Sequence, residues 1–176
     1  MFAGERCENG PMPSNPWMLL AVTANLLAAD PPPPRVFAAA QIEASYRVLL
    51  DRGSPLLESI VNIIQQKGIT DGHVTVTAGS VSECTYHYVA STEEKPKDVM
   101  RTVKGPFEIL NAGGIIAAGE PHIHITLSSP RQGAFGGHLE NGCRVLYLAE
   151  VTIVKYAGEP LQRRKNANGV SLLEAR

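Results

Sequence analysis

The alternation of polar and aliphatic side chains in residues 122–127 is the feature that most constrains the fold of this chain. The letters HIHITL place His122, His124 and Thr126 at every second position, with aliphatic residues between them. Successive side chains of a β-strand point to opposite faces. The pattern therefore predicts a half-buried strand with both imidazoles on one face and the aliphatic side chains in a core.

The residues that follow predict a hairpin that brings a third imidazole beside this pair. Residues 129–133, SPRQG, have the composition of a tight connection. Gly136 and Gly137 directly precede His138, and glycines let the returning backbone approach closely without a Cβ clash. Three converging imidazoles can hold zinc with an open fourth position, as in catalytic or ligand-binding zinc sites. The predicted zinc ligands are His122, His124 and His138. The alternative is a set of polar histidines on an exposed strand face.

Four short motifs occur in order along the second half of the chain. They are residues 105–110 (GPFEIL), 121–125 (PHIHI), 136–139 (GGHL) and 149–151 (AEV). Together they resemble the plants-and-prokaryotes-conserved (PPC) domain, also called the PD1-like DNA-binding domain, over residues 45–156. The resemblance implies a compact α/β domain that assembles as a homotrimer, with a metal on the H-x-H and G-G-H histidines and a DNA-binding, regulatory role. Plant members of the family add an Arg-Gly-Arg-Pro AT-hook, which this sequence lacks.

Hydrophobic periodicity predicts one main helix and several strands. Ser54 as N-cap, Pro55 at the first helical position and Lys67-Gly68 at the end bound a helix from Pro55 to Lys67. The predicted strands are residues 45–50, 73–78, 81–90, 99–103, 107–110, 115–118, 122–127 and 142–156. The last is apolar on both faces, as a strand covered on both sides would be. The predicted fold class is α/β of the α+β type, a mostly antiparallel sheet with one main helix packed on it.

Composition divides the chain into three parts. Residues 1–35 form an N-terminal extension that ends in consecutive prolines, a stiff polyproline spacer. Residues 36–158 form the PPC-like domain, and residues 159–176 form a C-terminal tail whose basic run is expected to be solvated surface. The longest apolar run, residues 17–29, is too short to cross a membrane. It also lacks the positive leader of a signal peptide, so we expect a cytoplasmic protein without membrane association.

Charge and cysteine content limit the partners. The chain has 16 basic and 17 acidic residues and a net charge of −1, whereas DNA affinity draws on a basic surface. This charge balance argues against binding nucleic-acid phosphates over a large part of the surface. It is compatible with a local basic patch. The widely spaced Cys7, Cys84 and Cys143 predict free thiols in a reducing compartment, with the last two as buried packing residues.

Three functions remain open at the level of sequence. The first is a zinc-binding regulatory homotrimer of the PPC type, with DNA and a small molecule at the metal as further partners. The second is a zinc-dependent hydrolase or lyase acting on a small carbonyl or carboxylate substrate, because three neutral imidazoles leave zinc its full charge. The third is a trimeric scaffold without a metal.

The enzyme hypothesis adds further site residues. They are Glu150 and Glu108 for catalysis, and Arg131, Gly136 and Gly137 for substrate binding. The two carboxylates would transfer protons, and the arginine would pair with a substrate carboxylate. His73 and His87 stand outside any motif and are predicted to be structural or surface residues.

Overall fold

The computed structural model describes residues 32–38, 41–158 and 160–176. Within these residues, every helix and strand belongs to one compact unit from Val36 to Arg176. Residues 32–35, from the other unit, are exposed and have no regular structure. The rest of the predicted N-terminal extension, including Cys7, lies outside the described residues. No helix in the described part of the chain is long and apolar enough to span a bilayer.

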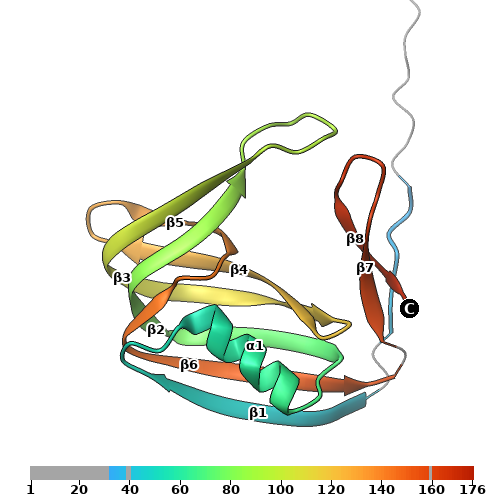
Figure 1. Cartoon of the computed structure of the whole chain (residues 1–176), viewed down its shortest axis with the longest axis horizontal. Helices are drawn as coiled ribbons and strands as arrows, with labels where there is room; N and C mark the ends of the chain where they lie inside the picture. Colours follow the sequence, from blue (N-terminus) through green and yellow to red (C-terminus); the bar gives the residue numbers. More distant parts are fainter. Residues whose placement is uncertain (1–31, 39–40, 159) are drawn as a thin grey trace, which may run out of the picture. The chain divides into compact units, whose positions relative to one another are not determined.

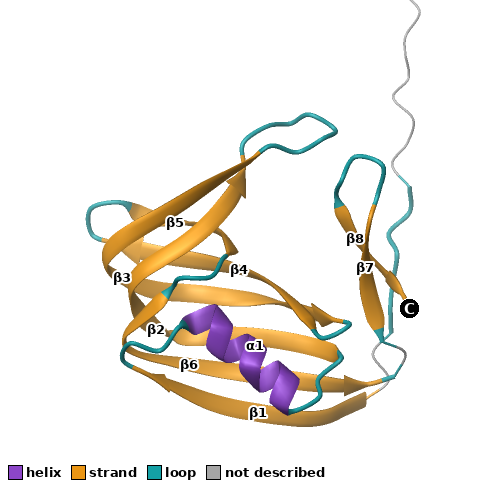
Figure 2. Ribbon diagram, viewed as in Figure 1, coloured by secondary structure: helices purple, strands orange, loops and turns teal. Residues whose placement is uncertain are grey.

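The unit is built from a twisted antiparallel sheet and one helix (Figures 1 and 2). In chain order the elements are β1 Gln41–Asp51, α1 Leu56–Gln66, β2 Asp71–Val89, β3 Asp98–Ala117, β4 Glu120–Ser129, β5 Gly133–Leu139, β6 Arg144–Ala157, β7 Leu161–Lys165 and β8 Ser171–Ala175. The larger sheet has the order β1-β6-β2-β3-β4-β5, and β5 also pairs with β2. Strands β2 to β5 therefore close on themselves, while β7 and β8 form a separate two-stranded sheet.

The predicted α/β fold class was wrong. Strands account for 65% of the described residues and helix for 8%, so the unit is a mostly antiparallel β structure with one short helix. Segments predicted as separate short strands are continuous: β2 contains two of them and β3 contains three. The register of β2 against β6 shifts around Gly79. A bulge bends a strand without ending it, so the two predicted segments on either side of Gly79 belong to one strand.

Helix α1 lies across β1, β6 and β2 and closes the core on that face (Figure 1). Leu56, Ile60 and Ile64 project from one side of the helix and are fully buried. This four-residue spacing puts them on a single stripe, and burying each such side chain contributes roughly 1.5–3 kcal/mol. The helix prediction is thus confirmed to within one residue at each end.

The start of α1 differs from the prediction in its cap. Pro55, not Ser54, is the N-cap, and no side chain caps the helix. The reason lies in the backbone just before the helix, which pairs with the start of β6. The Val145 N–H donates to the Ser54 carbonyl, and Pro55 forms a bridge with Arg144. This pairing holds Pro55 in the extended region, so the first turn begins one residue later.

Cys84 on β2 and Cys143 before β6 are joined by a disulfide. Both residues are fully buried, as predicted, but the prediction of free thiols was wrong for this pair. Glu83, which precedes Cys84, and Arg144, which follows Cys143, are cross-strand partners in the β2–β6 ladder. The two cysteines are 59 residues apart in sequence, so only the sheet topology brings them together.

Residues 161–175 of the predicted C-terminal tail form a hairpin. Strands β7 and β8 pair from Leu161 to Ala175. The Asn166 side chain accepts hydrogen bonds from the backbone N–H groups of Asn168 and Val170, a local turn device of Asn residues. The hairpin is tied to the larger sheet through Arg163, as described below.

Candidate metal centre

Strand β4 presents two imidazoles on one face. His122 and His124 alternate with Ile123 and Ile125, both of which are buried in the core. The alternation predicted for this strand is therefore confirmed. The His122 Nε2 and His124 Nε2 atoms face each other at 3.3 Å. Two ring nitrogens at that distance are close enough to bind one metal ion together.

Strand β5 returns beside β4 and adds the third imidazole. His138 is the direct cross-strand partner of His124. Its ring centroid is 4.5 Å from that of His122 and 5.6 Å from that of His124. One ring nitrogen from each of the three residues lies within 4.8 Å of the others. Tetrahedral zinc with bonds of 2.0–2.1 Å needs nitrogens about 3.3 Å apart, so the donor set fits zinc after small ring rotations.

Glycines allow the strands around these histidines to approach closely. A Cβ on Gly114 would collide with the His122 carbonyl oxygen. A Cβ on Gly137 would collide in the same way with the carbonyl oxygen of His87, on the opposite neighbour β2. A side chain at either position would push apart the backbones that set the positions of the imidazoles. The G-G-H motif is thus explained by close backbone packing.

The surroundings favour the neutral form of His122 and His138. Burial is the main cause that lowers the pKa of His122 to about 4, and charge repulsion from His138 and Arg163 makes smaller contributions to the same shift. Burial is also the main cause of the lowered pKa of His138, which the neighbouring Glu140 partly offsets. A neutral imidazole is the form that binds a metal. Both groups are therefore in the ligand-competent form at neutral pH.

A fourth imidazole, which sequence reasoning missed, borders the site. His87 on β2 is the cross-strand partner of His138 on the side away from β4. The two rings stack with centroids 4.5 Å apart, and His87 Nδ1 lies 2.7 Å from Glu140 Oε1. His87, His138 and Glu140 form a second group that could hold a metal. The β2–β5 pairing that creates this group has no signal in the sequence.

The other isolated histidine behaves as predicted. His73 Nδ1 lies 2.6 Å from the Tyr156 hydroxyl, across the β2–β6 ladder. His73 lies far along β2 from the group of His122, His124 and His138. It is not among the residues that line the cavity at those histidines. This contact is consistent with a structural role.

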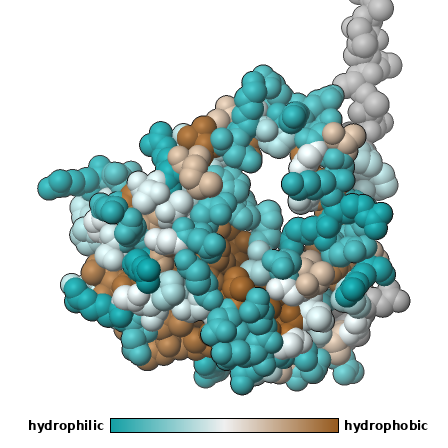
Figure 3. Space-filling view, viewed as in Figure 1, coloured by the Kyte–Doolittle hydropathy of each residue, from teal (hydrophilic) through white to brown (hydrophobic). Residues whose placement is uncertain are grey.

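The imidazoles open onto a cavity of about 630 Å³, here called the histidine cavity. Its lining includes His87, Asp98, His122, His124, Gly137 and His138 from the sheet, Pro96 from the β2–β3 connection, and Arg163, Lys165 and Ser171 from the C-terminal hairpin. The space-filling view shows an opening between the β2–β3 loop and the hairpin (Figure 3). Hydrophilic residues gather on the loop above it.

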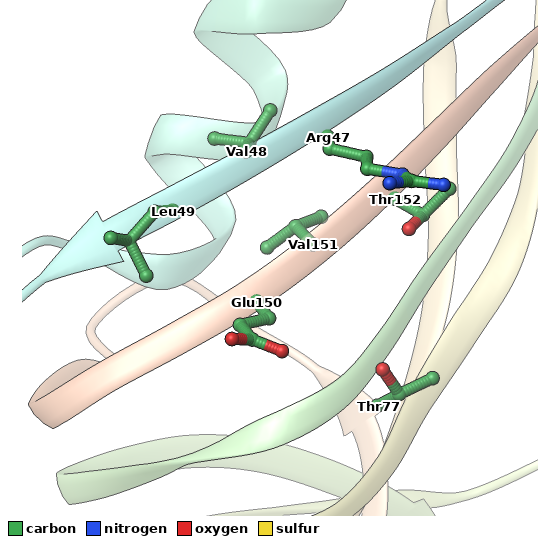
Figure 4. A pocket seen from close by; sticks show the side chains of 7 residues that line it. All are labelled: Arg47, Val48, Leu49, Thr77, Glu150, Val151 and Thr152. Atoms are coloured by element: carbon green, nitrogen blue, oxygen red, sulfur yellow. The ribbon is translucent and has the colours of Figure 1, made fainter.

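The remaining predicted site residues lie elsewhere, apart from the two glycines. Glu150 lines a separate cavity of about 480 Å³ beside Arg47 and Thr152, with no imidazole among the lining side chains (Figure 4). Arg131 lines a third cavity with Phe107, and Glu108 is exposed on β3. Neither glutamate nor Arg131 is among the residues that line the histidine cavity. Gly137 lines it, and Gly136 is the preceding residue on β5.

The sequence of the unit matches a known family. The profile of the Plants and Prokaryotes Conserved (PCC) domain covers residues 37–157. The chain belongs to this family. The resemblance inferred from the four motifs is therefore confirmed, and the C-terminal hairpin lies beyond the matched range.

Solved structures share the fold of this family member. The metal-containing protein of Archaeoglobus fulgidus superposes with a TM-score of 0.68 at 25% identity, over 79% of this chain and 98% of that one. A PPC protein of Pyrococcus horikoshii gives 0.67 at 25% identity, over 81% and 99%. A Bacteroides thetaiotaomicron protein named for DNA binding gives 0.67 at 21% identity, over 78% and 96%.

A curated relative is much longer than this chain. The bifunctional protein GlmU of Synechococcus sp. (strain JA-2-3B'a(2-13)) is 26% identical over 108 residues. The match covers 61% of this chain and 16% of that protein. The chain thus spans about a sixth of the length of this relative.

Proposed function

We propose that this PCC-domain protein binds zinc through His122, His124 and His138. The observation that carries the proposal is the convergence of the three ring nitrogens within 4.8 Å of one another. The lowered pKa values of His122 and His138 support it, because metal ions bind the neutral imidazole. A relative from Archaeoglobus fulgidus, named as a metal-containing protein, supports a bound metal in this fold.

The bound zinc would serve as a ligand-binding centre. Three imidazoles leave zinc its full positive charge and a coordination position for water or a ligand donor. The protein's own part is to hold the rings on β4 and β5, at the base of a cavity whose volume suits a small molecule. A regulatory domain that senses a small ligand at this position is the function that the arrangement supports best.

Metal content tests the proposal directly. Protein purified without a nickel column should contain close to one zinc per chain, measured by mass spectrometry of the metal. His124→Ala should lose it. Thr126→Ala is the matched control, because Thr126 shares the strand and the exposed face but offers no imidazole. A wild-type protein without metal, or a His124→Ala variant that keeps it, would contradict the proposal.

We also propose a homotrimeric assembly, as the family resemblance implies. Uncovered apolar side chains support an association surface. Exposed examples are Leu49 (59%), Leu110 (53%), Ile115 (43%), Tyr147 (67%) and Leu148 (40%). Light scattering coupled to gel filtration should give three times the chain mass of 18.9 kDa. A monomer at micromolar concentration would contradict the trimer.

DNA association is a second candidate function. Its support is that structural neighbours from Bacteroides thetaiotaomicron and Ralstonia eutropha are named for DNA binding. The net charge of −1 predicts weak binding that depends on a local basic patch. Retention on immobilised duplex DNA at low salt, lost steeply as salt rises, would support this function. Elution that does not change with salt would contradict it.

A further inference from the structure

The C-terminal hairpin places cationic side chains at the histidine cavity. Arg163 and Lys165 on β7 line this cavity together with the imidazoles. The family match ends at residue 157, so these two side chains lie beyond the matched range.

Among the described residues, the hydrogen bonds of the Arg163 side chain go to backbone carbonyl groups. Its guanidinium donates to the carbonyl oxygens of Glu120 at 3.4 Å and Ile115 at 3.3 Å. Ile115 is the cross-strand partner of His122, so the guanidinium is fixed next to the strand pair that carries the imidazoles. A guanidinium has five N–H donors, and these two contacts leave others available.

The charge of Arg163 has no counter-ion among the described residues. No carboxylate there lies within 4.0 Å of it, whereas the neighbouring Arg164 pairs with Glu174 at 2.9 Å. Burial lowers the pKa of Arg163, because partial removal from water disfavours its charged form. A half-buried cation without a partner is costly unless an anion joins it.

The other groups that face the cavity leave it positive. Asp98 is the one acid among its described lining residues, and it lies 4.0 Å from His87 Nε2 on the sheet side. Among the lining residues, Arg163 and Lys165 outweigh this single carboxylate. Glu140, which is not among the lining residues, contacts His87 Nδ1. A concave surface with excess positive charge concentrates anions.

We propose that Arg163, assisted by Lys165, binds a small oxyanion, the carboxylate or phosphate group of a ligand that occupies the histidine cavity. Arginine matches such groups because its N–H donors fit two oxygens at once. The inference rests on the proposed function in one respect, since the bound zinc would supply a second contact for the same ligand. The cationic contact itself depends only on residues of this chain.

Calorimetric titration of the full chain tests the inference, with malonate and inorganic phosphate as separate probes. Wild type should bind at least one of them saturably. Arg163→Gln should weaken that binding roughly tenfold or more, the effect of a lost charge-assisted hydrogen bond. Arg164→Gln should change the affinity less than about twofold, since an exposed pair on the outer hairpin contributes little. Equal affinities of wild type and Arg163→Gln, or no saturable binding of either probe, would overturn the inference. The tighter of the two probes identifies the type of oxyanion.

The zinc content of every sample is measured before titration, so the two proposals can fail separately. Samples stripped with a chelator form the second arm. The stripped wild type is expected to bind the oxyanion probe more weakly than the untreated protein. If Arg163→Gln weakens the binding further in stripped samples, the oxyanion contact is supported whether or not the native protein contains zinc. If zinc is present and the Arg163→Gln variant binds like wild type, the zinc proposal stands and the oxyanion contact falls.

A purely structural role for Arg163 needs its own control. Limited proteolysis of Arg163→Gln reveals whether residues 161–175 have come away from the sheet. If they have, Lys165→Gln replaces it as the test, because Lys165 is exposed at the end of β7. A measurable loss of oxyanion affinity in Lys165→Gln then supports the inference, and an unchanged affinity overturns it.

Discussion

The two cavities of the sheet differ in how they are built. The histidine cavity, of about 630 Å³, collects imidazoles from β2, β4 and β5 and cations from the hairpin. The Glu150 cavity, of about 480 Å³, collects one acid, one arginine, two threonines and aliphatic residues from β1, β2 and β6. In the first, ring nitrogens from adjacent strands converge; in the second, the lining residues include no group of three metal-ligating side chains. The comparison teaches that cross-strand register, more than the presence of an ionisable residue, makes a candidate site.

The largest expected effect is on zinc affinity. His138→Ala removes one of three ligands. Even the loss of a residue that only hydrogen-bonds a metal ligand typically lowers metal affinity 10–100-fold. We therefore expect a loss of roughly a hundredfold or more, measured by competition with a chromophoric chelator. Glu150→Gln, in the other cavity, serves as the control and should leave the affinity unchanged. A similar loss in both variants would remove the distinction between the cavities.

A smaller effect is expected from closing the space beside His122. Gly114→Ala would drive a methyl group into the His122 carbonyl, and overpacking of this kind costs about 1–3 kcal/mol. Gly113→Ala is the matched control, because its new Cβ would lie 3.4 Å from the Val74 carbonyl oxygen, an ordinary contact. Urea unfolding measures both. If the two variants lose equal stability, the close approach at Gly114 is not what positions His122.

The metal-free protein should lose stability in mild acid. The pKa of His122 falls from 6.5 to about 4 on folding, so the unfolded chain binds more protons between these values. The free energy of unfolding that depends on a neutral His122 is therefore fully present above pH 6.5. It is lost as the pH falls toward 4. Thermal melting from pH 7 to 4 measures the loss, which His122→Gln should reduce. A pH slope that is identical in the variant would contradict this origin.

The smallest effect is expected at Glu150 itself. Glu150→Gln should change stability by less than about 0.5 kcal/mol, as exposed substitutions usually do, because the carboxylate is exposed on β6 and has no salt bridge within 4.0 Å among the described residues. The same chemical denaturation experiment checks it. A large loss would mean that the Glu150 cavity is covered in the assembled protein, for example by another copy of the chain.

Local patterns were sufficient to predict the histidine strand and the helix. The period-two pattern at His122–Leu127 matches β4, and the apolar stripe at Ile60 and Ile64 matches α1. These signals depend on neighbouring residues only, so they can be read from one sequence. The convergence of His122, His124 and His138 was predicted on the same basis, because a hairpin fixes the register of its own two strands.

Features that depend on distant strands could not be predicted. His87 joins His138 through the β2–β5 pairing, and Cys84 meets Cys143 through the β2–β6 pairing. Nothing in the local sequence specifies either register. Register shifts around Gly79 lie inside β2, which continues through segments that had been interpreted as separate strands. Glu150 was predicted as catalytic because it is an acid in an apolar strand, but its strand carries it to the other cavity.

The pairing of β5 with both β4 and β2 has a consequence for the time course of folding. The β4–β5 hairpin is local and can form early, whereas His87 and Glu140 are 53 residues apart and meet only when the ring of strands closes. Contacts between residues distant in sequence form slowly, because the entropy of closing the intervening chain is lost first. A metal that binds the β4–β5 histidines would therefore act on a hairpin that exists before the cavity does. Adding zinc during refolding should then accelerate an early step, while the final closure against β2 keeps its own slower rate.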